Sequence, residues 1–416
     1  MNRFFDLNHK LLLLLFLAAS VAYPLYVTAK YVPTTPEGDR KEISARQDIT
    51  DLYTSASHAK SRDMLKWWTG SWIYPDCNYY RPVTSMLYFA EYKSFGSRFE
   101  YYNRVSWLLH GLNAALICLL MLSLFSHHSR LKYPLGISAA WFFSSTEGCY
   151  SFGVLKAISW WPAQNDVMSL SFALLCLILL DQGLKQHRRS LYCASLLAFA
   201  FSVWTKEMGY ITLPLALMLI VYRKGVLYKE LAGYVITTAM LWSIRRLAVP
   251  DPWSPGFKLK QHGMKLLMSW GGPVYGQLAS GIWWGVTAVV LLMVLIGAAL
   301  HQGWRWIYVF PAAITIIVLC AQLIGPGWEI LVLASSWITM LRLGFYMLAP
   351  VLFWRYRRSE PGWYTGACLL LVFLPILNYG GMHYFYWPAA FQGMADAGLC
   401  LCIYRGVREM PCFSRV

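Results

Sequence analysis

Apolar runs long enough to cross a lipid bilayer recur along nearly the whole chain. A helix needs roughly 20 apolar residues to cross the hydrocarbon core. Hydrophobic residues make up 57% of the 416 positions and charged residues 13%, a composition that would leave a soluble domain with large exposed apolar patches. We therefore predict an all-α membrane protein with about twelve membrane-spanning helices, near residues 10–28, 105–125, 133–152, 167–183, 190–205, 209–222, 231–249, 280–299, 306–324, 330–353, 362–378 and 388–404.

The basic residues indicate the orientation of these spans, because loops that stay in the cytoplasm are enriched in Lys and Arg. With the N-terminus inside, every predicted inner segment is basic and the outer segments are of mixed sign. The formal net charge of +16 is spread over these short loops, so it does not indicate a nucleic-acid partner. We predict an integral membrane protein in contact with the bilayer, with both termini cytoplasmic.

The chain is interpreted as one polytopic membrane domain over residues 1–416. Its largest extracytoplasmic loop spans 29–104, and a second outer loop spans 250–279. The first loop is rich in Trp and Tyr, whose amphipathic rings are favoured at the membrane surface. Short interfacial helices are therefore expected in it.

Polar stretches interrupt the apolar background at a few places. The first loop and the following span contain YYRPVTSMLYFAEYKSFG and YYNRVSWLLHGLNA, and later stretches read AISWWPAQNDVMSLSFALL at 157–175, VWTKEMGYITLPL at 203–215 and MHYFYWPAAFQ at 382–392. These stretches resemble the type-C (GT-C) membrane glycosyltransferase superfamily. They are most similar to the membrane part of the tetratricopeptide-containing transmembrane O-mannosyltransferases and their bacterial relatives.

The resemblance implies a GT-C-like fold and an enzyme with a polyprenyl-phosphate-linked sugar as donor. The sugar would pass to a glycan, lipid or protein acceptor at the extracytoplasmic face by inverting displacement. Because the chain contains no Asn-x-Ser/Thr glycosylation site, a bacterial inner membrane is the expected location. The pattern departs from the family at two points: an adjacent Asp-Asp pair is missing from the first loop, and His383 stands where an arginine is expected.

An aspartate in the first outer loop is the expected catalytic base, because it can take the proton from the acceptor hydroxyl as the new bond forms. Asp48 and Asp51 are the candidates, since three residues apart on a helix they share one face. Either of them could instead cap a short helix beginning at Leu52.

Basic side chains are expected on the departing phosphate, and Arg81 is the first candidate because Arg grips phosphate oxygens in a bidentate manner. The alternative is that Arg81 stacks on a neighbouring tyrosine or pairs with an acid. Ionisable residues at membrane depth usually mark function. The further candidates for donor phosphate are Lys206, Lys258, Lys260 and Arg342, and the other site candidates are Tyr80, Asp166, Glu207 and His383.

Three of these candidates also have structural interpretations. Lys206 and Glu207 could form a mutual ion pair that holds the turn between two spans, and Asp166 could simply begin a helix. No metal-ligand spacing occurs in the sequence. No cofactor is predicted, and a divalent metal is left open.

A transporter and a catalytically inactive GT-C-like scaffold are the competing functions. A transporter predicts charged or broken helices that meet near mid-membrane, whereas the enzyme predicts acids and bases gathered at the outer face. The missing Asp-Asp pair is the reason for considering an inactive scaffold.

Overall fold

A computed structural model describes residues 43–74, 78–125, 132–144, 157–224 and 228–249, with single positions at 14, 18, 154, 386, 387, 389–391, 393, 394 and 397. These residues form helices joined by short connections, with no β-strand among them. In chain order the elements are α2 (Ile43–His58), α3 (Asp63–Thr69), α4 (Pro82–Phe95), α5 (Phe99–Leu124), α6 (Lys132–Ser144), the 3₁₀ turn η1 (Trp161–Ala163), α8 (Gln164–Gln186), α9 (Arg189–Thr205), the 3₁₀ turn η2 (Glu207–Ile211), α10 (Thr212–Lys224) and α11 (Tyr228–Ala248).

Helices α5, α6, α8, α9, α10 and α11 fall on the six consecutive predicted spans from 105–125 to 231–249, which confirms that the described parts of these runs are helical; residues 145–152 of the second run lie outside the described residues. Two segments, Tyr101–Leu124 and Trp161–Gln186, are long and apolar enough to cross a membrane by length and composition. The predicted spans from 280 to 378 lie outside the described residues, and those at 10–28 and 388–404 are described at single positions only.

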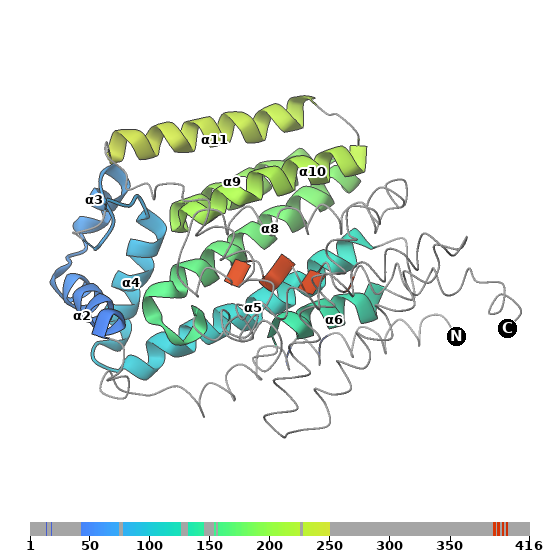
Figure 1. Ribbon diagram of the computed structural model, residues 1–416. Helices are drawn as coiled ribbons and strands as arrows, with labels where there is room; N and C mark the ends of the chain where they lie inside the picture. The colour runs from blue at the N-terminus through green and yellow to red at the C-terminus, as the bar shows by residue number, and fades with distance from the viewer. Residues whose placement is uncertain are drawn as a thin grey trace, which may run out of the picture.

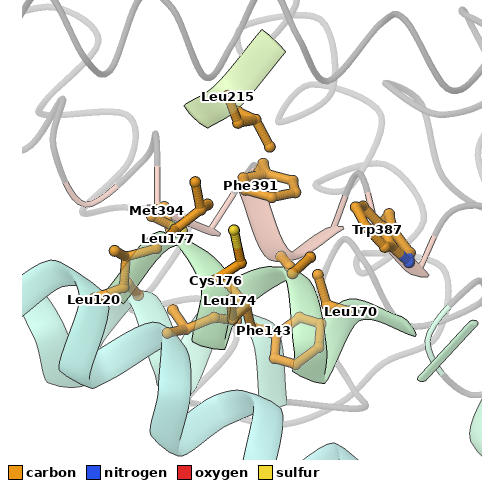
Figure 2. Packing of buried hydrophobic residues seen from close by; sticks show 14 of the residues in the cluster. Leu120, Phe143, Leu170, Leu174, Cys176, Leu177, Leu215, Trp387, Phe391 and Met394 are labelled. Carbon is orange, nitrogen blue, oxygen red and sulfur yellow. The ribbon is translucent and has the colours of Figure 1, made fainter. Parts of the chain in front are cut away.

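The bundle is built around α8, which packs along α9 and also contacts α5 and α10, while α6 lies against α5 (Figure 1). The side chains between them are aliphatic or aromatic and nearly inaccessible to solvent. Trp387, Phe391 and Met394 from the end of the chain enter the same core beside Leu170, Leu174 and Leu177 of α8 (Figure 2). Chain segments more than 200 residues apart thus share one core.

The three helices of the first loop, α2, α3 and α4, gather at one end of the bundle (Figure 1). A second, smaller core holds them there, with Leu52 of α2, Trp67 of α3 and Tyr88 of α4 packed against Trp161 of η1. The predicted helices of the first loop are therefore present, and they rest on the beginning of α8.

Helix α4 has clear local signals at both ends. Pro82 occupies its first turn, where a missing backbone N–H costs nothing. Arg81, which precedes the proline, has φ −139° and ψ 63° and lies outside the helical region, as the residue before a proline is expected to. Gly96 ends the helix at φ +56°, and its N–H donates to the carbonyl of Tyr92.

The sharp turn from α9 into η2 depends on a close backbone approach at Gly209. A Cβ at this position would overlap the backbone of Ser202 and Val203. The Gly209 N–H also donates to the Lys206 carbonyl at 2.8 Å. This contact fixes where Lys206 and Glu207 stand at the end of the bundle.

We expect Gly209→Ala to lower the unfolding free energy by about 1–3 kcal/mol, because backbone has to shift to admit the methyl group. The measurement is denaturant unfolding of the purified protein in detergent, followed by tryptophan fluorescence. Gly70→Ala is the matched control, since its new Cβ would meet only the Lys66 carbonyl at 3.3 Å. Equal stability of the two variants would contradict the close approach.

Candidate functional site

Arg81 and Glu207 form a buried ion pair that joins the first loop to η2. The Nε and Nη2 atoms of Arg81 donate to Glu207 Oε2 at 2.9 and 2.6 Å, and both side chains are less than one-tenth exposed. The Arg81 guanidinium also lies 4.0 Å from the ring centre of Tyr79 and 4.8 Å from that of Trp72. Both parts of the structural alternative for Arg81, pairing with an acid and stacking on a tyrosine, are therefore confirmed.

A second buried pair links Lys206 to the first turn of α8. Lys206 Nζ lies 2.5 Å from Asp166 Oδ2 and donates to Asn165 Oδ1 at 3.2 Å. The carboxylate of Asp166 stands in the first helical turn, where the helix dipole also favours negative charge. Lys206 and Glu207 thus reach outward to α8 and to Arg81 instead of forming the predicted mutual pair.

The end of the chain is tied to the same place by hydrogen bonds. The Trp387 indole N–H donates to the Asp166 carbonyl at 3.1 Å. The Tyr386 hydroxyl lies 2.9 Å from His110 Nδ1 and accepts a hydrogen bond from Asn113 Nδ2 at 3.1 Å. Five separate stretches of sequence therefore meet in one buried polar network.

Asp48 and Asp51 lie inside α2, which begins at Ile43. The alternative that one of them caps a helix beginning at Leu52 is therefore wrong. Asp51 Oδ2 accepts a hydrogen bond from the Tyr74 hydroxyl at 3.0 Å, and the Tyr74 ring lies 5.9 Å from that of Trp72, which stacks on Arg81. Burial and the neighbouring carboxylate of Asp51 raise the pKa of Asp48.

The remaining predicted residues divide into two groups. Tyr80 is buried, and its hydroxyl donates to the Trp68 carbonyl at 3.0 Å, which ties α4 to the end of α3. The other four predicted site residues, Lys258, Lys260, Arg342 and His383, lie outside the described part of the chain. Within the described residues no group of three or more His, Cys, Asp or Glu side chains is arranged to hold a metal ion.

Glu91 is a buried carboxyl group that sequence reasoning missed. It lies on α4 and accepts hydrogen bonds from Trp161 Nε1 at 2.8 Å and from Gln164 Nε2 at 2.7 Å. On the same face of α4, the Tyr88 hydroxyl donates to the Pro162 carbonyl at 2.9 Å. These bonds fasten α4 to η1 and so to the turn of α8 that carries Asp166. The available signal was a single acid within a mostly apolar and aromatic helix.

Arg245 and Tyr210 are two further polar residues that the sequence analysis did not single out. They lie on α11 and η2, beside the Arg81–Glu207 pair, with Arg245 Nη2 at 4.0 Å from Glu207 Oε1. The signal for them was the Arg245-Arg246 pair at the outer end of a predicted span, the end at which basic residues are not favoured.

The stability of the protein should decrease as pH rises through the range in which Glu91 ionises. Burial raises the pKa of Glu91 from 4.5 to about 7. Between these values the folded protein keeps a proton that the unfolded chain releases, so the unfolding free energy falls by about 3 kcal/mol. Glu91→Gln should remove most of this dependence.

Melting midpoints measured in detergent between pH 4 and pH 8 test the role of Glu91. Glu230→Gln, at a partly exposed glutamate on α11, is the control and should keep the slope of the parent protein. The same slope in the parent and in Glu91→Gln would contradict the assignment.

Breaking the Arg81–Glu207 pair from one side should destabilise the protein strongly. Arg81→Met or Glu207→Gln alone should each cost about 3–5 kcal/mol, because each leaves a buried charge without its partner. The double variant should cost at least about 2 kcal/mol less than the sum of the two.

A double-mutant cycle in unfolding free energy measures this coupling. The control cycle pairs Glu207→Gln with Arg104→Met, since Arg104 is exposed and stacks on Tyr101 of its own helix. Additive effects at Arg81 and Glu207 would show that the pair is not coupled.

Comparison of the chain with protein-family models, with curated proteins and with solved structures found no match. The resemblance in the sequence thus stays a prediction, and the role of the site has to be argued from its own geometry.

Proposed function

We propose that the protein is a polytopic membrane glycosyltransferase that moves a sugar from a polyprenyl-phosphate carrier to an acceptor at the extracytoplasmic face. The observation that supports it is the convergence of the separate stretches that resemble the type-C glycosyltransferases. Arg81, Asp166, Lys206, Glu207 and the segment at Tyr386 are joined by direct contacts at one end of the bundle.

The distribution of charge along α8 also favours this function. Asp166 begins the helix, and Asp181 lies 15 residues later, about 23 Å away at 1.5 Å per residue. Asp181 pairs with Arg223 at 2.6 Å and with Lys185 at 2.7 Å. The buried charges of α8 thus lie near its two ends with only uncharged, mostly apolar side chains between them, whereas a transporter would place its charges near mid-membrane.

In the proposed reaction a carboxylate of α2 accepts the proton of the acceptor hydroxyl. The acceptor oxygen then forms a bond to the anomeric carbon of the sugar, while the bond from that carbon to the phosphate oxygen breaks and the carrier leaves as polyprenyl phosphate. Asp48 suits the base because its pKa is raised towards the working pH. Asp51, held by Tyr74, would orient the acceptor.

The buried ion pairs change the roles expected of Arg81 and Lys206. Both cations already contact a carboxylate, so a phosphate would have to displace Glu207 or Asp166 at a large desolvation cost. We therefore propose that they hold the elements of the site together, while the donor phosphate binds beside them.

A catalytically inactive scaffold is the second candidate, and the same ion pairs favour it. Two cations balanced by two carboxylates make a stable junction that needs no substrate. If the protein is such a scaffold, the parent protein should show no turnover with any donor.

Transfer assays with polyprenyl-phosphate sugars and the purified protein in liposomes test the proposal. We expect Asp48→Asn to lower the turnover about 10²–10⁴-fold, the usual contribution of a general base, and Asp51→Asn to lower it less. Asp63→Asn is the control, because Asp63 only closes the start of α3 on the Lys60 N–H and Lys66. Unchanged turnover in both α2 variants would exclude the proposed base.

A further inference from the structure

Three buried polar atoms that have no hydrogen-bond partner among the described residues lie around one spot between η2 and α11. They are Glu207 Oε1, the Tyr210 hydroxyl and Arg245 Nε. Buried polar groups are nearly always hydrogen-bonded, and leaving one without a partner costs about 1–3 kcal/mol. Three such atoms in one place indicate a site built to receive a polar ligand.

The side chains around this spot are held in place by their other contacts. Glu207 Oε2 takes both hydrogen bonds from Arg81, which fixes the carboxylate and leaves Oε1 facing Arg245 Nη2 at 4.0 Å. Trp242 of α11 lies between the two elements, with its ring centre 6.1 Å from that of Tyr210 and 5.6 Å from the Arg245 guanidinium. The donors are thus arranged before any ligand arrives.

The chemistry of these atoms selects the kind of ligand. Arg245 and Tyr210 offer N–H and O–H donors that suit a phosphate oxygen, and the exposed Arg246 adds a second positive charge beside Trp242. Glu207 Oε1 can only accept a hydrogen bond, so it suits a hydroxyl and disfavours a second anionic group. A phosphate that carries a neighbouring hydroxyl, such as a sugar phosphate, satisfies all three atoms.

The position of the site indicates that this phosphate belongs to a lipid, because Arg245 lies at the outer end of a predicted span, near the expected bilayer surface. The end of α11 that carries Arg245 lies over α3 of the first loop (Figure 1).

We propose that the phosphate of the lipid-linked sugar donor binds Arg245 and Tyr210 and that a hydroxyl of its sugar donates to Glu207 Oε1. This inference deepens the proposed function and rests on it. It places the donor beside the Arg81–Glu207 pair, with Arg245 in the role that the sequence analysis gave to Arg81 and Lys206.

Binding of a fluorescent polyprenyl monophosphate to the protein in neutral phosphatidylcholine nanodiscs tests the site. Arg245→Met should weaken binding at least about tenfold and Tyr210→Phe about three- to tenfold, because each removes a donor to the phosphate. Arg104→Met, which removes an exposed arginine on another helix, should leave binding within about twofold. Tyr210→Phe removes a single hydroxyl, so the test holds even if the arginine variant unfolds. Binding that is unchanged in both site variants would overturn the assignment.

Two competitors separate the donor from other anions. The glucosyl ester of the same lipid phosphate should compete at least as well as the bare phosphate, and phosphatidylglycerol and inorganic phosphate should compete much more weakly. Exclusion of the ester, or equal competition by phosphatidylglycerol, would overturn the donor assignment. The two proposals can fail separately. If binding depends on Arg245 but no donor supports transfer, the binding site stands and the enzyme proposal fails. If transfer occurs but binding does not depend on Arg245, the enzyme proposal stands and the binding site is overturned.

Discussion

The paired charges of Arg81 with Glu207 and of Lys206 with Asp166 are the constraint on which the end of the bundle depends. Each pair is buried, and each joins segments that are far apart in sequence. Charges removed from water are tolerated only when they are closely paired and hydrogen-bonded. The first loop, the beginning of α8 and the turn after α9 therefore have to meet in one arrangement, because any other would leave a charge uncompensated.

The same junction decides what the neighbouring groups can do. Because Glu207 uses one carboxylate oxygen for Arg81, its other oxygen faces Arg245 with its bonding capacity unused. Arg81 in turn stacks on Trp72 and Tyr79, whose loop leads through Tyr74 to Asp51. The Arg81–Glu207 pair is thus linked on one side, through Trp72, to the carboxylates of α2 and on the other side to Arg245. Polar side chains held in place in this way are what a preorganised site requires.

Sequence reasoning performed best where one local rule decides the outcome. Six consecutive predicted spans are helical over their described residues, because a long apolar run satisfies its own backbone hydrogen bonds in that form. Arg81 lies outside the helical region because Pro82 follows it. The alternative that Asp48 or Asp51 caps a helix beginning at Leu52 was wrong, because α2 begins five residues before Asp48 and no strong capping residue marks that point.

The sequence by itself determined the helical, predominantly apolar character of the chain and the polar stretches at which to look for a site, since these follow from composition and short-range spacing. Only the tertiary structure decided which charge meets which: Lys206 and Glu207 are adjacent, yet they pair with Asp166 and Arg81. Only packing showed that the Glu91 side chain, the Tyr210 hydroxyl and the Arg245 Nε atom are buried. The reason is that burial and pairing are set by contacts between distant segments, and a linear pattern of residue types contains no information on which of several possible partners a buried charge will meet.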